Sequence, residues 1–215
     1  MMKDIAIYGA GGYGRETACL INIINKKETQ WNLIGFFDDV KEMGYKTEYG
    51  LVIGGMNELN AYDKPLAIVI AIRSPNSLFS VASRITNTMV EYPNIIAPDT
   101  IFLDKKNLSM GKGNLISFGC SLSCHVTIGD FNSFNGNTGV GHDAQIGSFN
   151  SIMPATRISG SVKIGDRNFF GIASVVLQGI TIGNDTVVGA NSLIIHKTKE
   201  GKTYLGNPAM VLNFK

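Results

Sequence analysis

An apolar residue recurs at every sixth position over fifteen consecutive hexads of this 215-residue chain. The positions are Met110, Ile116, Leu122, Ile128, Phe134, Val140, Ile146, Ile152, Ile158, Ile164, Phe170, Val176, Ile182, Val188 and Ile194. A helix repeats about every 3.6 residues and a strand alternates every two, so neither produces this period. The spacing predicts a chain wound into a three-sided coil, with one inward apolar residue on each side.

The length of one coil follows from a dipeptide that returns every eighteen residues. It occurs as Ile128-Gly129, Ile146-Gly147, Ile164-Gly165 and Ile182-Gly183. Eighteen residues are three hexads, so we expect a parallel β-helix built from hexapeptide repeats. The alternative, an ordinary β-sandwich, would have to keep the same six-residue phase over all fifteen hexads, so we set it aside. Glycine after the inward residue is expected where a sharp corner needs freedom in φ.

Composition narrows the class of protein. The repeat region from about 94 to 194 leaves room for one further small domain, so we expect domains at 1–93 and 94–215. The net charge of +2 and the absence of a Lys/Arg run argue against nucleic acid and anionic membranes as partners. No signal-peptide pattern or long apolar run is present, and the three cysteines form no CxxC pair. These features predict a soluble, cytoplasmic protein that binds a small molecule.

The first residues carry a nucleotide-binding pattern. A strand expected at Ile5–Tyr8 is followed by a GxGxxG loop, 9–14, and by a helix from Thr17 to about Lys26. In this pattern Gly9 permits a tight turn, Gly11 lets backbone N–H groups approach a phosphate, and Gly14 lets the helix pack on the strand. We therefore expect a pyrophosphate at the positive end of the helix dipole.

The next two strands supply polar groups to the same edge. Leu33–Phe37 ends at Asp38 and Asp39, whose carboxylates can accept hydrogen bonds from a ribose or a base. Leu66–Ile72 leads through Arg73 into a helical segment that ends at Ile85. Only about 90 residues precede the β-helix, which is half of a dinucleotide fold. A mononucleotide-sized ligand is therefore favoured over NAD, and a purely structural glycine turn is the alternative.

The chain has three histidines, and their place in the coil distinguishes them. His142 lies two residues after inward Val140, which puts it at an outward corner. Gly160 follows one coil later, about 4.8 Å away, whereas His196 is three coils and about 14 Å away. An imidazole beside a backbone N–H suits acyl transfer, since it offers a base for the nucleophile and a donor for the oxyanion. Asp143 could orient the ring.

Two other readings of these histidines remain. His142 could be an ordinary solvated residue, as we expect for His125, which is one residue out of register, and for His196. Trimeric β-helices of the gamma-class carbonic anhydrase type bind Zn²⁺ through three histidines, but such ligands must converge to about 2 Å from the metal. His142 and His196 are too far apart in one chain for this, so no metal is expected.

Several motifs together resemble a known family. They are Gly9-Ala-Gly-Gly-Tyr-Gly-Arg-Glu16, Phe36-Phe-Asp-Asp39, Ala71-Ile72, Gly141-His-Asp143, Ile146-Gly-Ser-Phe149, Pro154, Ser159-Gly-Ser-Val162, Phe169-Phe-Gly171, Val188-Gly-Ala-Asn-Ser192 and Gly206-Asn-Pro-Ala209. The combination is similar to the sialic acid O-acetyltransferase and nucleotide-4-amino-sugar N-acetyltransferase group. The resemblance spans nearly the whole chain. It implies a homotrimer with a Rossmann-like N-terminal domain and a left-handed β-helix that uses acetyl-CoA.

The resemblance also implies roles for particular residues. His142 would be the general base and Asp143 its acidic neighbour. The sugar-nucleotide side would be formed by Gly11, Gly12, Tyr13, Asp38, Asp39 and Arg73. Acetyl-CoA would lie along the coils between subunits, near Gly160, Ser151, Ile172, Asn207, Pro208 and Ala209.

Four positions depart from the family pattern. Ser151 stands where a second histidine is often found, Tyr13 replaces a common histidine, and Arg73 replaces the usual glycine. Met210 replaces the basic residue after Asn-Pro-Ala, which leaves Lys197, Lys199 or Lys202 to meet the CoA phosphates.

The expected function is acetyl transfer from acetyl-CoA to the amine of a nucleotide-linked amino sugar, in surface-glycan biosynthesis. The pyrophosphate would bind at the glycine loop and the amine would reach His142. O-acetylation of sialic acid or another free sugar is the main alternative. A carbonic-anhydrase-like metalloenzyme and a non-catalytic sugar-nucleotide-binding scaffold are more distant ones.

Overall fold

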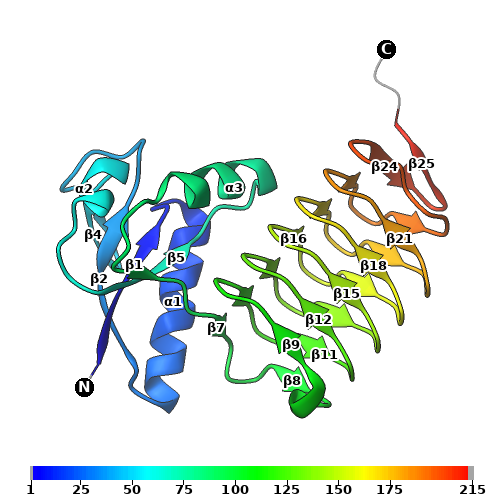
Figure 1. Cartoon of the computed structure of the whole chain (residues 1–215), viewed down its shortest axis with the longest axis horizontal. Coiled ribbons are helices and arrows are strands. Elements are labelled where there is room, and N and C mark those ends of the chain that lie inside the picture. Colours follow the sequence, from blue (N-terminus) through cyan, green and yellow to red (C-terminus); the bar gives the residue numbers. More distant parts are fainter. Residues whose placement is uncertain (1, 213–215) are drawn as a thin grey trace. The chain divides into compact units, whose positions relative to one another are not determined.

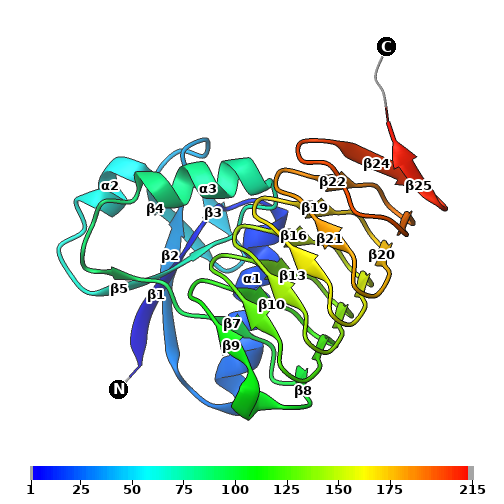
Figure 2. The same cartoon turned by 45° about the vertical axis from the view of Figure 1, so that its right-hand side comes forward.

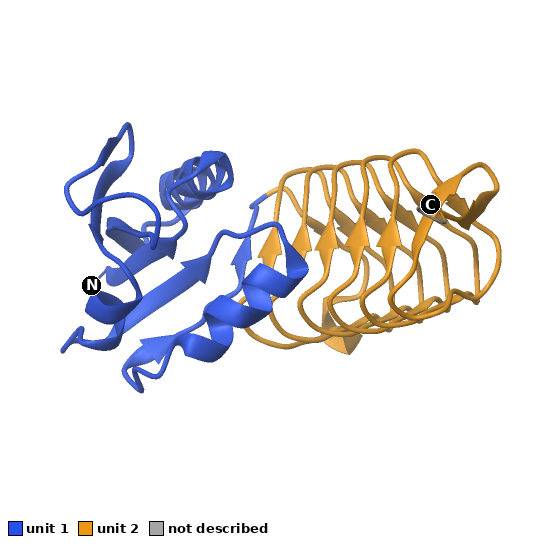
Figure 3. Cartoon of the chain, turned by 90° about the horizontal axis from the view of Figure 1, so that it is seen from above, with its two compact units in different colours: residues 1–98 blue, residues 99–215 orange. Residues whose placement is uncertain are grey.

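The computed structural model describes residues 2–212 and divides the chain into two compact units, one ending at Pro98 and the other beginning at Asp99 (Figure 3). The first unit is an α/β domain and the second is a stack of coils made from two-residue strands (Figure 1).

The first unit is built on a sheet in the order β3-β4-β2-β1-β5-β6. All neighbours pair in parallel except β3 and β4, which form an antiparallel hairpin. The strands are β1 (Lys3–Tyr8), β2 (Trp31–Phe37), β3 (Lys46–Thr47), β4 (Gly50–Gly54), β5 (Leu66–Ile70) and β6 (Val90–Glu91). The helices are α1 (Gly12–Lys27), α2 (Met56–Asn60) and α3 (Pro75–Arg84). A further short strand, β7, spans Ile95–Ile96.

The core of this unit explains why these segments form strands. β5 is buried at all five positions, and the inner residues of β1 and β2 are fully or almost fully buried. Such uninterrupted apolar strands are typical of a parallel sheet covered on both faces. The Rossmann-like domain predicted from the glycine loop is confirmed. Its first helix begins at Gly12, five residues before the predicted start, because Gly11 serves as the N-cap.

The second unit is the predicted left-handed parallel β-helix, with three sheets that each gain one strand per coil (Figure 2). The first sheet contains β10 (Leu115–Ile116), β13 (Ser133–Phe134), β16 (Ser151–Ile152), β19 (Phe169–Phe170), β22 (Val187–Val188), β24 (Thr203–Gly206) and β25 (Ala209–Val211). The second contains β8 (Ile101–Phe102), β11 (Ser121–Leu122), β14 (Gly139–Val140), β17 (Arg157–Ile158), β20 (Val175–Val176) and β23 (Leu193–Ile194). The third contains β9 (Ser109–Met110), β12 (Thr127–Ile128), β15 (Gln145–Ile146), β18 (Lys163–Ile164) and β21 (Thr181–Ile182). A 3-10 helix, Lys105–Asn107, interrupts the first coil.

The register of the coils matches the sequence period. Gly139 pairs with Arg157 and Arg157 with Val175, each eighteen residues on. The repeated apolar residues from Ile116 to Ile194 are all buried, so each coil adds three inward side chains to one continuous core.

The corners use glycine for a different reason from the predicted one. Gly129 and Gly147 follow an inward residue, yet neither has positive φ. A Cβ on Gly129 would come within 2.8 Å of the Gly147 carbonyl oxygen, so the corner needs glycine because the next coil leaves no room. The left-handed conformation falls two residues later, as at Phe131 and Phe149. The prediction of φ freedom at the first corner position is therefore wrong.

Candidate active site

His142 and Asp143 form a pair at the corner between β14 and β15. The His142 Nδ1 atom lies 2.7 Å from Asp143 Oδ2, and both side chains are about half exposed. A carboxylate can only accept a hydrogen bond, so the imidazole donates through Nδ1, and in the neutral ring the lone pair is then on Nε2. The Asp143 backbone adopts a positive φ of 57°, and the corresponding residues of other corners also have positive φ. Nε2 is therefore the ring nitrogen that Asp143 does not engage.

The Nε2 atom of His142 lies directly over Gly160 in the next coil. A Cβ added to Gly160 would stand only 2.5 Å from Nε2 and 2.6 Å from Cε1 of the ring. The Ser161 amide donates to the His142 carbonyl oxygen over 2.7 Å, which fixes the backbones of the two corners against each other. The predicted juxtaposition of His142 and Gly160 is present, and it exists because residue 160 has no side chain.

The other two histidines occupy different positions in the coil. His125 adopts φ of 55°, the conformation that Asp143 has one coil later, so it is out of register with His142 as predicted. His196 follows β23 near the end of the repeat and is exposed. Within the described residues, no three His, Cys, Asp or Glu side chains are grouped closely enough to hold a metal ion.

Apart from Gly160, the residues predicted to contact acetyl-CoA lie elsewhere on the coil. Ile172 is half exposed at the corner between β19 and β20, which joins the first sheet to the second. His142 lies at a different corner, between β14 and β15, which joins the second sheet to the third. Asn207, Pro208 and Ala209 form the turn and first strand residue of the β24–β25 hairpin. Ser151 begins β16, is fully buried, and lies 3.4 Å from Ser133 through their hydroxyl oxygens. One chain therefore does not bring these residues together with His142.

The glycine loop follows β1 at the carboxyl edge of the sheet. Gly9 has φ of 106°, and a Cβ on Gly14 would collide with the Gly9 carbonyl oxygen, so both glycines have the roles predicted for them. At Gly11 and Gly12 an added Cβ would meet nothing within 4 Å. The backbone at the start of α1 is therefore accessible to a ligand, as a phosphate site requires.

Asp38 and Asp39 are already engaged in the structure. Asp38 accepts hydrogen bonds from the Ala10 amide at 2.7 Å and from the amides of Val40 and Lys41. Asp39 accepts from the Met56 amide and lies 3.2 Å from Arg84. Asp38 thus ties the glycine loop to the end of β2, a structural role that the sequence motif did not predict.

Tyr13 and Arg73 come together beside that loop. The Arg73 guanidinium lies 4.5 Å from the centre of the Tyr13 ring and 2.6 Å from a carboxylate oxygen of Glu16. The sequence named both residues as candidates but did not predict that they touch.

No helix among residues 2–212 is long and apolar enough to span a membrane.

Known proteins resemble this chain in both parts. Residues 4–85 match the family model described as the PglD N-terminal domain. PerB from Caulobacter crescentus, solved with CoA and GDP-perosamine, has 21% identity and a TM-score of 0.89, with 99% of each chain covered. The acetyltransferase domain of PglB from Neisseria gonorrhoeae FA1090, solved with acetyl coenzyme A, has 25% identity and a TM-score of 0.88, covering 99% of this chain and 100% of that one.

A third solved structure gives the same result. WeeI from Acinetobacter baumannii AYE has 24% identity and a TM-score of 0.87, again covering 99% of this chain and 100% of its own. A search of curated proteins found no match. These matches confirm the resemblance and the fold predicted from the sequence motifs. Residues 4–85 are therefore similar to the PglD N-terminal domain, and the chain shares, over nearly its full length, the fold of these three proteins.

Proposed function

We propose that this protein transfers an acetyl group from acetyl-CoA to the amine of a nucleotide-linked amino sugar, in cytoplasmic surface-glycan biosynthesis. The observation that carries the proposal is the His142 imidazole, which is held by Asp143 through Nδ1 with Nε2 over Gly160. The structures of PerB with CoA and GDP-perosamine and of the PglB domain with acetyl coenzyme A support the substrate classes.

The proposed reaction uses His142 as the base. The sugar amine attacks the thioester carbonyl carbon, a C–N bond forms, and the amine proton passes to Nε2 of His142. The C–S bond then breaks, and the imidazolium returns the proton to the departing CoA thiolate. The Gly160 amide is the proposed donor to the oxyanion. Asp143 keeps the ring in the required tautomer and stabilises the transient imidazolium.

We also propose that the active protein is a homotrimer. His142 and Ile172 occupy different corners, on either side of the sheet of β14, β17 and β20. A neighbouring copy can place its own Ile172 corner against His142, which completes an acyl-donor groove. The outward residues of this sheet are Ile101, Gly139, Val175 and Leu193 together with the polar Ser121 and Arg157, whereas those of the third sheet are all polar: Ser109, Thr127, Gln145, Lys163 and Thr181. The less polar face is better suited to self-association.

Acceptor identification is the direct test. The protein is incubated with acetyl-CoA and separately with 4-amino sugars linked to GDP, UDP and dTDP, or with free sialic acid, and products are identified by mass. We expect one nucleotide-linked amine to gain a single acetyl group. Acetylation of free sialic acid alone would contradict the proposal and support the O-acetyltransferase alternative. Sedimentation equilibrium that gives a monomer near 23.2 kDa at micromolar concentration would contradict the trimer.

A further inference from the structure

The carboxyl ends of β1 and β5 lie at the same edge of the sheet in the first unit, because the two strands pair in parallel. β1 lies between β2 and β5 in the sheet, so the chain leaves β1 toward one side and returns on the other. In open parallel sheets a ligand binds where the strand order reverses in this way. The loop after β1 contains Gly9, and a Cβ there would come within 3.0 Å of the Ala71 carbonyl oxygen after β5. The two loops thus face each other across this point.

Arg73 is the cation that the loop after β5 brings to this edge of the sheet. Its guanidinium reaches back over Tyr13 of the glycine loop and forms an ion pair with Glu16 in the first turns of α1. About a third of the Arg73 side chain is exposed. Stacking on an aromatic ring and a carboxylate partner both restrict a long side chain that would otherwise be mobile.

The contacts of Arg73 leave it suited to an anion beside Gly11 and Gly12. A guanidinium has five N–H donors in a planar fork, so it can hold Glu16 and a phosphate oxygen together. The backbone at Gly11 and Gly12 is open, since an added Cβ would meet nothing within 4 Å, and its amides are further candidate donors to the same anion. Glu16 alone would repel a diphosphate, and Arg73 offsets that charge.

We propose that Arg73 binds the diphosphate of the nucleotide-linked substrate, with Tyr13 and Glu16 as positioning residues that hold its guanidinium over the glycine loop. This inference rests on the proposed function and assigns one residue of that site. Acetyl-CoA also contains a diphosphate, so the experiment must separate the two sources.

The test measures binding of GDP and UDP, and of guanosine and uridine, by calorimetry. The wild type is compared with Arg73→Ala, Arg73→Lys and a control, Lys3→Ala. Lys3 forms a similar exposed ion pair with Glu91, at the opposite end of β1. For the nucleotide that the wild type binds better, we expect Arg73→Ala to raise Kd by about 10- to 100-fold, as loss of a hydrogen bond to a charged group implies.

Three further readouts identify the phosphate as the target. Affinity for the nucleosides and the KM for acetyl-CoA should be unchanged in Arg73→Ala. Arg73→Lys should recover part of the affinity, because lysine keeps the charge but not the fork. Added salt should weaken binding to the wild type more steeply than binding to Arg73→Ala. Lys3→Ala should bind both nucleotides like the wild type.

The outcomes separate this inference from the proposed function. Equal nucleotide affinity in Arg73→Ala and the wild type would overturn the role of Arg73, as would equal losses for nucleosides. A raised KM for acetyl-CoA with unchanged nucleotide binding would assign Arg73 to the acyl donor instead and also overturn it. Failure to acetylate any nucleotide-linked amine, with the Arg73 effect intact, would overturn only the proposed function.

Discussion

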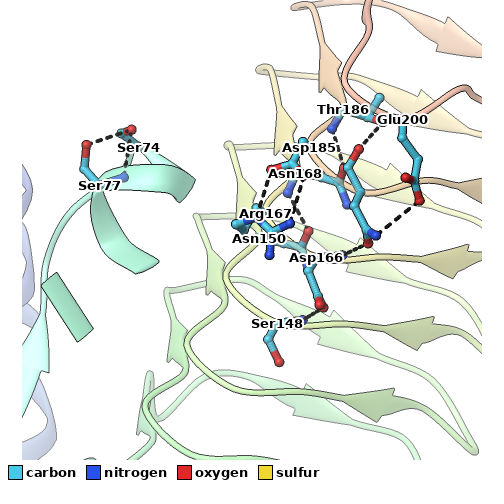
Figure 4. A network of polar contacts seen from close by, with 11 residues as sticks. Ser74, Ser77, Ser148, Asn150, Asp166, Arg167, Asn168, Asp185, Thr186 and Glu200 are labelled. Carbon is cyan, nitrogen blue, oxygen red and sulfur yellow. Dashed lines mark hydrogen bonds and ion pairs between the residues drawn. The ribbon is translucent and has the colours of Figure 1, made fainter. Parts of the chain in front are cut away.

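Two corners of the same coils are built in opposite ways. The His142 corner consists of the turns 123–126, 141–144, 159–162 and 177–180, whereas the asparagine corner consists of the turns 111–114, 129–132, 147–150, 165–168 and 183–186. At the His142 corner an exposed imidazole lies over a glycine. At the asparagine corner side chains are joined from coil to coil (Figure 4). The first arrangement leaves groups available for a substrate, and the second uses them for stability.

The asparagine corner contains a ladder of hydrogen bonds. The side-chain oxygens of Asn114, Asn132 and Asn150 each accept from the amide of the next asparagine one coil later, over 2.9 Å in every case. The Asn168 oxygen continues the ladder to Thr186 over 2.7 Å. All of these side chains are buried, so each oxygen satisfies a backbone donor that has no access to water. At the His142 corner the matching inward positions are filled by apolar side chains such as Ala144 and Val162, which offer no such acceptor.

The largest expected effect is the loss of turnover when the proposed base at the His142 corner is removed. His142→Ala should lower kcat by about 10²- to 10⁴-fold, because it removes the proposed general base. Since His142 is half exposed and outside the core, the melting temperature should stay within error of the wild type. Steady-state kinetics and thermal unfolding measure the two effects. His196→Ala, in the same register three coils on, is the control, and near-wild-type turnover of His142→Ala would end the assignment.

The second prediction concerns Gly160→Ala, which retains the His142 imidazole but displaces it. In Gly160→Ala the new Cβ would lie 2.5 Å from Nε2 of His142, so the imidazole must leave its position. A displacement of this size can cost about 10²-fold in rate. We expect kcat to fall with little change in folding stability. Ser159→Ala, in the same turn, is the control. Unchanged kcat in Gly160→Ala would mean that the juxtaposition has no role in the reaction.

The two corners also differ in what their sequence could predict. The juxtaposition of His142 and Gly160 followed from counting eighteen residues, because strict stacking turns sequence separation into spatial position. In the sequence, the asparagines at 114, 132, 150 and 168 form only a polar residue that repeats every eighteen positions. The hydrogen-bond ladder of these asparagines depends on side-chain conformation, which the period of the sequence does not determine. The contact between Arg73 and Tyr13 depends on two loops that meet at a sheet edge. The acyl-donor groove proposed above would need a second copy of the chain, which the sequence of one chain does not place.

The third prediction weakens the asparagine corner. Asn150→Ala removes the acceptor of the Asn168 amide and the side-chain donor to the Asn132 oxygen, whereas the backbone amide of residue 150 still donates to that oxygen. Unsatisfied buried polar groups should lower the free energy of unfolding by about 3 kcal/mol. At a temperature where the variant remains folded, kcat should be close to that of the wild type. Chemical denaturation is the measurement, with exposed Gln145→Ala as the control. A large loss of kcat in folded Asn150→Ala would show that the two corners are not independent.

The smallest expected effect is at the outer surface of the asparagine corner and depends on pH. Arg167 donates two hydrogen bonds to Asp185, at 2.8 and 2.9 Å, and these hold the pKa of the Asp185 carboxyl below its usual value. A carboxyl whose pKa is lower in the folded state stabilises the protein above its unfolded pKa of 3.8, and this contribution is lost as pH falls through the folded value. Because both side chains are partly exposed, Asp185→Asn should cost only about 0.5 kcal/mol at pH 7. The difference from the wild type, measured by denaturation between pH 7 and pH 3, should shrink toward the acid end. A constant difference across this range would mean that the pair acts through packing and not through charge.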